Sequence, residues 1–165
     1  MATIFPFFEW CEKTALFRVI SNHESFFPAL ETIHLFGLVL LLGTTLILCL
    51  RLLGVIMAKQ PVPELAAELA NYTASGLALM LSSGALMFVA TAVRNYSNTS
   101  FWVKMIFLAA ALIFHFAYFR KVIRMEDSGT EDSGLARRRG KLAAWGALVL
   151  WFGVALSGRS IGFLG

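Results

Sequence analysis

Four long apolar runs occupy most of this chain and constrain its fold more than any short motif does. They cover residues 29–50, 72–93, 101–119 and 142–160. Each has about 20 residues, the length that an α-helix needs to cross ~30 Å of hydrocarbon. Because the backbone must satisfy its own hydrogen bonds within lipid, we expect each run to be a transmembrane helix.

The composition supports the same class of protein. Hydrophobic residues make up 58% of the chain and charged residues 15%, with a mean hydropathy of +0.73. Soluble domains carry about 25% charged residues, and 165 residues are too few to enclose so much apolar surface. We therefore expect a single membrane domain over residues 1–165, with the lipid bilayer as its solvent and no nucleic-acid partner.

The basic residues predict the topology. Nine of the 14 Lys and Arg residues lie in the connections after the first and third runs: Arg51, Lys59, Arg120, Lys121, Arg124, Arg137, Arg138, Arg139 and Lys141. Cytoplasmic connections carry such an excess. We expect 120–141 to be a cytoplasmic loop, solvated over 122–140, and both termini to lie outside.

Residues 3–20 combine many aromatic side chains with charged ones and predict an amphipathic helix in the membrane interface. Short connections favour up-and-down helices. The expected fold is an all-α, antiparallel four-helix membrane bundle with an N-terminal interfacial helix. Cys11 and Cys49 fall at opposite membrane levels, so no disulfide is expected between them.

The most specific polar feature is the pair Glu31 and His34 in the first run. Their i, i+3 spacing places both side chains on one helical face. Arg94, Lys104 and Arg159 fall at nearly the same level and would ring the outer mouth of the bundle. This ring is either a structural latch, with Glu31 paired to Arg159 and His34 bonded to a neighbouring helix, or a functional site, since ionisable residues inside membranes are often functional.

Three functional versions follow. In the first, His34 ligates a b-type haem, Gly37 admits the macrocycle, Met87 supplies a second axial ligand, and Lys104 or Arg159 holds the propionates. In the second, the cationic mouth binds a quinone, a lipid or an anion.

The third version is a copper or zinc site. Its ligands would be Glu31, His34 and His23 or Glu24 at the outer face, because imidazole suits these metals.

His115 in the third run lies too deep to share a haem with His34. It either ligates a separate inner cofactor or bonds to a backbone carbonyl, Ser82 or Ser83. The sequence has no nucleophile–base pair, phosphate loop or zinc-protease motif, so no catalytic residue is assigned. The leading hypothesis is a haem- or quinone-associated electron-transfer protein, with an accessory subunit of a larger membrane complex as the alternative. Other membrane proteins or a second copy are the expected partners.

The first span, with its Glu-x-x-His pair, resembles that of a family of uncharacterised bacterial four-helix inner-membrane proteins. The matching features are the lead-in at Phe27 and Pro28, Gly37, Gly43, residues 51–54, Ser83, Gly84, Phe101, Lys104, Gly158 and Arg159. The resemblance implies the same fold, an outer polar cluster and the inner (plasma) membrane of a bacterium. The family's third span would carry a histidine nearer its inner end, where this chain has Phe119.

Overall fold

The computed structural model describes residues 4–23, 25–125 and 133–164, and this part of the chain is helical without any β-strand. Four helices are long and apolar enough to cross a membrane. They are α3 (Phe26–Leu53), α4 (Val62–Ala90), the third span from α6 (Thr99–Phe114) through the π-helix η1 (His115–Phe119) into α7 (Arg120–Met125), and α8 (Ser133–Leu164). The all-α four-helix fold that the sequence predicts is confirmed.

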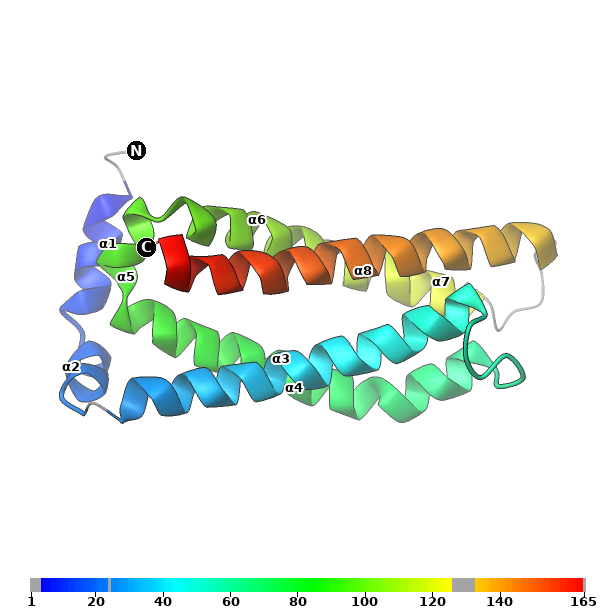
Figure 1. Cartoon of the computed structure of the whole chain (residues 1–165), viewed down its shortest axis with the longest axis horizontal. Coiled ribbons are helices and arrows are strands. Elements are labelled where there is room, and N and C mark those ends of the chain that lie inside the picture. The colour runs from blue at the N-terminus through cyan, green and yellow to red at the C-terminus, as the bar shows by residue number, and fades with distance from the viewer. Residues whose placement is uncertain (1–3, 24, 126–132, 165) are drawn as a thin grey trace.

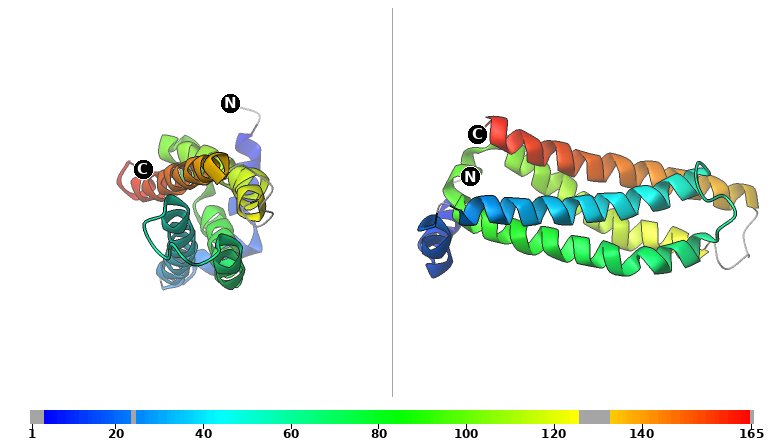
Figure 2. Two further views of the ribbon diagram at one scale, coloured as in Figure 1. Left: turned by 90° about the vertical axis from the view of Figure 1, so that its right-hand side faces the viewer. Right: turned by 60° about the horizontal axis from the view of Figure 1, so that its bottom comes forward.

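The four spans run side by side with alternating direction (Figures 1 and 2). α3 packs against α4 and α8, and α8 packs against α6. α4 and α6, both described over their full length, nowhere bring their Cα atoms within 8 Å of each other. We call the end of the bundle where α1 and α2 lie the terminal end, and the opposite end the loop end (Figure 1).

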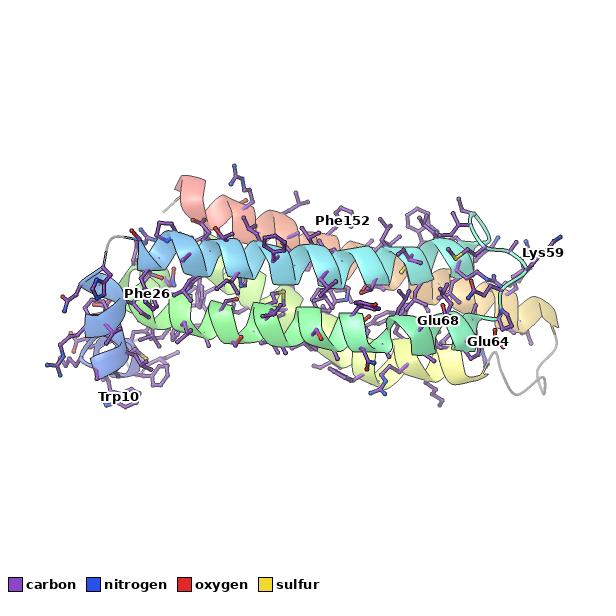
Figure 3. All side chains as sticks on the ribbon, turned by 90° about the horizontal axis from the view of Figure 1, so that it is seen from below. Trp10, Phe26, Lys59, Glu64, Glu68 and Phe152 are labelled. Atoms are coloured by element: carbon purple, nitrogen blue, oxygen red, sulfur yellow. The ribbon has the colours of Figure 1, made fainter. Side chains whose placement is uncertain are left out.

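The outer surface of the spans is apolar. Phe36 and Val39 of α3 are 71% and 70% exposed, and Ile106, Ile113, Val149 and Phe152 are also exposed. Figure 3 shows Phe152 pointing outward in mid-bundle, whereas the charged Lys59, Glu64 and Glu68 gather at the loop end. Hydrocarbon can cover this surface without cost and water cannot, so the chain is a multi-pass membrane protein.

Glycines bring α3 and α4 into close contact. A Cβ added to Gly37 would lie 2.7 Å from the Met80 amide nitrogen, and one added to Gly76 would lie 2.8 Å from the Leu41 nitrogen. Small residues allow such backbone contact in membranes, where dispersion rather than the hydrophobic effect drives helix association. Gly37 and Gly76 therefore fix the register of the two helices.

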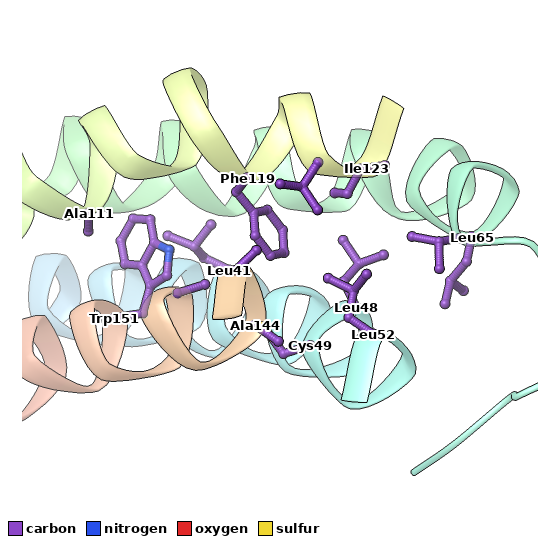
Figure 4. Packing of buried hydrophobic residues seen from close by; sticks show 14 of the residues in the cluster. Leu41, Leu48, Cys49, Leu52, Leu65, Ala111, Phe119, Ile123, Ala144 and Trp151 are labelled. Carbon is purple, nitrogen blue, oxygen red and sulfur yellow. The ribbon is translucent and has the colours of Figure 1, made fainter. Parts of the chain in front are cut away.

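Large side chains fill the core between the other helices. Trp151, Phe119 and Leu41 are almost fully buried at its centre (Figure 4). On the α6 side, the rings of Phe107 and Phe114 lie directly over Gly153 and Gly146 of α8. α8 thus accepts bulky side chains from α6 at its glycines.

The N-terminal segment forms two helices instead of the single predicted helix over 3–20. α1 (Phe5–Glu12) and α2 (Ala15–Ser21) run across the terminal end of the bundle (Figure 1). They are separated at Thr14, whose hydroxyl accepts a hydrogen bond from the Phe17 N–H and so caps α2. Threonine at an N-cap starts a new helix, which is why the amphipathic pattern is interrupted there.

α1 is fastened to the bundle by aromatic packing and one hydrogen bond. Phe8 is buried among Phe88, Phe101 and other apolar residues of the terminal end. The Glu12 carboxylate accepts a hydrogen bond of 2.9 Å from the Val93 N–H. Cys11 and Cys49 are both free and buried, which confirms that they form no disulfide.

Two connections contain more helix than predicted. The second span ends at Ala90, before the end of the predicted apolar run at 93, and a short helix α5 (Ala92–Ser97) lies in the connection to α6. The expected solvated loop over 122–140 is helical at both sides, because α7 runs to Met125 and α8 begins at Ser133; the rest lies outside the described residues. α4 begins at Val62, well before the apolar run at 72, and the charged Glu64 and Glu68 lie in this additional part of the helix.

Candidate functional site

His34 lies on the side of α3 that faces α4. Its Nδ1 is 3.0 Å from the Ser83 Oγ, so the imidazole is bonded to the neighbouring helix. Gly84 leaves room for the ring, because a Cβ at that position would lie 3.1 Å from His34 Cε1. Ser83 and Gly84 therefore act together, one as the hydrogen-bonding partner and the other as the space that the ring fills.

The hydrogen bonds of Ser83 indicate which nitrogen of His34 carries the proton. The Ser83 hydroxyl has one proton, which it donates to the Leu79 carbonyl. Ser83 Oγ must then accept from His34 Nδ1–H, and the backbone of Met80 also interacts with this imidazole. We assign the neutral ring the proton on Nδ1, which leaves the lone pair of Nε2 available.

Lys104 approaches the same region from the opposite side of the bundle. It lies on the face of α6 that carries the buried residues Phe101 and Ala111, and it is itself half-buried. Its Cε and Nζ are each 3.5 Å from the position of a Cβ at Gly158 of α8. Gly158 therefore gives the lysine side chain space along α8.

Lys104 is close enough to His34 for an electrostatic interaction, although α3 and α6 are not in backbone contact. No carboxylate of the described residues lies within 4 Å of the Lys104 ammonium. A cation in a membrane bundle normally pairs with a carboxylate or reaches the headgroups. All four spans thus contribute to one polar cluster near the terminal end, which we call the His34–Lys104 cluster: His34, Ser83, Gly84, Lys104 and Gly158.

The other members of the predicted outer ring are not part of this cluster. Glu31 is exposed, and the described residues contain no ion pair between Glu31 and Arg159 within 4 Å, so the structure does not have the pairing that the structural-latch alternative included. Arg94 is exposed on α5, and Arg159 is exposed on α8. The i, i+3 spacing of Glu31 and His34 holds, but only His34 turns toward α4.

The predicted metal site is not assembled in the described part of the chain. It contains no group of three or more His, Cys, Asp or Glu side chains able to hold a metal ion. His23 lies in the turn before α3, where its ring packs near Phe26. Glu24 lies outside the described residues.

A haem fits these residues poorly. Gly37 was expected to make room for the macrocycle, but its open side is filled by the backbone of α4 at Gly76 and Met80. Met87 follows Ser83 by one turn on α4, which itself packs directly against α3. Because the α4 backbone fills the side of Gly37 that was expected to admit the macrocycle, we derive no chemistry through a haem there.

His115 occupies a separate position. It opens the π-helix η1, and its ring stacks on Phe119 with centroids 5.6 Å apart. Its Nδ1 is buried and has no hydrogen-bond partner, so this nitrogen makes none of the bonds to Ser82, Ser83 or a carbonyl that were one alternative for His115. Ser83 instead serves His34, and Ser82 is exposed and bonded to the Leu79 carbonyl.

Sequence reasoning found His34 and Lys104 but missed what positions them. The sequence offered Ser83 as a partner of His115, and Gly84 and Gly158 as features shared with the resembling family. The register of α3 against α4 would have placed Ser83 and Gly84 beside His34, and this register follows once Gly37 and Gly76 are recognised as the point where the two helices cross.

Comparison with protein families places this arrangement in a known group. One family model matches residues 7–164, nearly the whole chain. The chain belongs to DUF6644, a family of unknown function. The match to DUF6644 includes all four spans and every residue of the His34–Lys104 cluster. No curated protein and no solved structure matches the chain.

Proposed function

We propose that this chain is a membrane redox protein that binds a quinone at the His34–Lys104 cluster. The observation that carries the proposal is the pairing of two complementary groups. An imidazole whose assigned tautomer leaves Nε2 as an acceptor lies within electrostatic reach of a lysine ammonium that has no carboxylate partner among the described residues. A hydroquinone loses a proton and becomes an anion before it is oxidised to the neutral quinone, so it needs a proton acceptor and a positive charge around its head.

The proton chemistry follows from the tautomer. His34 Nε2 would accept a proton from a hydroquinone O–H, and the Ser83 oxygen would hold the resulting imidazolium through Nδ1–H. Lys104 would stabilise the negative charge left on the oxygen of the hydroquinone anion. Oxidation of this anion to the quinone releases two electrons and the second proton; the electrons would pass to a redox protein in the same membrane, and the proton to water at the membrane surface. This chain would then act together with that redox protein, as the accessory-subunit alternative also requires.

The positive-inside rule supports a location for the cluster. The basic connections lie at the loop end, so the terminal end and the cluster would face the outer side of a bacterial plasma membrane. Protons from hydroquinone oxidation would then be released outside. This orientation is part of the proposal.

The test is quinone binding by the protein purified in mild detergent. Quinone is extracted and quantified, and binding of a short-chain hydroquinone is titrated by calorimetry. Lys104→Met should weaken binding roughly ten- to hundredfold, because a charge-assisted hydrogen bond contributes about 1.5–3 kcal/mol. His34→Gln should weaken binding of the hydroquinone more than binding of the quinone, because only the hydroquinone has an O–H to donate to Nε2.

Matched controls separate the site from general damage. Lys121→Met removes an exposed lysine at the loop end, and Ser82→Ala removes the exposed neighbour of Ser83. Both should bind quinone as the unaltered protein does. Equal binding in Lys104→Met and Lys121→Met would refute the proposal. A visible spectrum and elemental analysis of the same sample complete the test, since a Soret band, bound copper or zinc, or a colourless quinone-free protein would favour the haem, metal and accessory-subunit hypotheses respectively.

A further inference from the structure

A π-helix interrupts the third span toward the loop end. The five residues of η1 replace α-helical turns, and the Arg120 N–H bonds to the His115 carbonyl. The segment His-Phe-Ala-Tyr-Phe contains neither glycine nor proline, which are the usual causes of helix irregularity. π-helical turns are rare and frequently mark functional positions, so the groups that this turn brings to the surface are candidates for binding.

The buried Nδ1 of His115 indicates which ring nitrogen carries the proton. Nδ1 is buried without a hydrogen-bond partner, and burying an unpaired N–H costs more free energy than burying an unpaired lone pair. The neutral ring therefore carries its proton on Nε2, the nitrogen that is not sealed. His115 is only partly buried, so it presents an N–H donor at the edge of the span, opposite in character to the free lone pair of His34.

Arg120 lies beside this donor. Its guanidinium carbon is 5.8 Å from the centre of the Phe116 ring, a cation–π contact that holds the side chain against the span. Arg120 is close enough to His115 for an electrostatic interaction, and no carboxylate of the described residues lies within 4 Å of the guanidinium. Phe116 and Tyr118 are exposed on the same turn, where hydrocarbon chains would cover them.

The spacing of the two groups suits one kind of ligand. Arg120 follows His115 by five positions, with four residues between them, so the two lie at most about 7.5 Å apart along the helix axis. Arg120 is the outer of the two, at the loop-end boundary, and His115 lies deeper. A glycerophospholipid has the same order of groups, with an anionic phosphate at the membrane surface and ester carbonyls a few ångströms below it.

We infer that the π-helical turn is a binding site for an anionic diacyl phospholipid. Arg120 binds the phosphate, His115 donates its Nε2–H to an ester carbonyl, and the acyl chains lie over Phe116 and Tyr118. Basic residues at the cytoplasmic boundary of membrane helices attract anionic headgroups, and the histidine adds recognition of the ester. The site is independent of the His34–Lys104 cluster.

The experiment measures lipid retention by native mass spectrometry. The full-length protein is released from nanodiscs made of phosphatidylcholine with either ester-linked or ether-linked phosphatidylglycerol; the ether lipid has the same charge but no ester carbonyl. The protein should retain the ester lipid about two- to tenfold better, the range expected of one net hydrogen bond. His115→Phe should abolish this discrimination and keep the preference for the anionic headgroup.

Two further variants make the result decisive. Arg120→Gln should lose the preference for phosphatidylglycerol over phosphatidylcholine, whereas Lys121→Gln, which removes the adjacent exposed cation, should keep it. Equal retention of the ester and ether lipids by the unaltered protein would overturn the inference, as would ester discrimination that survives in His115→Phe. A variant that does not fold is recognised by its far-UV circular dichroism and is replaced by His115→Leu.

Discussion

The contact between α3 and α4 at Gly37 gives a prediction whose size follows from the structure. In Gly37→Ala, the new Cβ would lie 2.7 Å from the Met80 amide nitrogen and 3.0 Å from the Gly76 carbonyl oxygen. Both atoms belong to backbone and cannot move aside by a rotamer change. The two helices would have to separate, and overpacking of this kind costs about 1–3 kcal/mol.

Gly43→Ala is the matched control, because Gly43 lies on the same helix and a Cβ there meets nothing within 4 Å. Alanine is favoured over glycine in a helix by about 0.5–1 kcal/mol at either position. This gain cancels when the two variants are compared, so the difference between them measures the clash alone. Gly43→Ala should be equal to or more stable than the unaltered protein, and Gly37→Ala less stable than Gly43→Ala by about 1–3 kcal/mol.

The assay is reversible unfolding by sodium dodecyl sulfate in mixed micelles, followed by far-UV circular dichroism. The double variant Gly37→Ala/Gly76→Ala should cost less than the sum of the two single changes, because one separation of the helices relieves both contacts. Equal stability of Gly37→Ala and Gly43→Ala would refute the reasoning. Separation should also lengthen the bond of 3.0 Å between His34 and Ser83 and weaken quinone binding.

Two other predictions concern the terminal end. Gly84→Ala would bring a Cβ to 3.1 Å from His34 Cε1, so the ring must shift, and we expect weaker hydroquinone binding in calorimetry with little loss of stability; unchanged binding would count against the placement of His34. Burial, and to a smaller extent the charge of Glu12, raise the pKa of the Cys11 thiol. Maleimide labelling of Cys11 should therefore be slow at neutral pH and accelerate only above the ordinary thiol pKa of about 8.5, and rapid labelling at pH 7 would show that α1 is not seated as described.

The spans were predictable because lipid imposes one simple requirement on sequence. A run of about 20 apolar residues is enough to identify a helix in hydrocarbon, whatever it packs against. The ends of the helices were less predictable, since polar residues of α4 and α8 continue the helices beyond the membrane. Thr14 and Thr91 divide helices through local backbone geometry, which hydropathy does not register.

The candidate site was predictable only in its charged members. An intramembrane His34 or Lys104 stands out from apolar neighbours in any sequence. Whether Glu31 faces the bundle or its surface depends on how α3 is rotated, and that rotation is set by the glycine contact with Gly76. The rotation of a helix about its axis depends on how its surface packs against a neighbouring helix. The sequence of one helix considered by itself therefore does not determine it.

The pattern of neighbours among the spans also bears on how the protein is made. α3 and α4 form a hairpin with direct backbone contact, so they can associate as soon as both have entered the bilayer. The third span follows in the chain, yet its α6 portion has no close neighbour among the earlier long helices. α8 follows these helices in the chain and contacts both α3 and α6. During insertion, the α6 portion of the third span should therefore remain surrounded by lipid until α8 has been made, and α8 should then connect the α3–α4 hairpin to the third span.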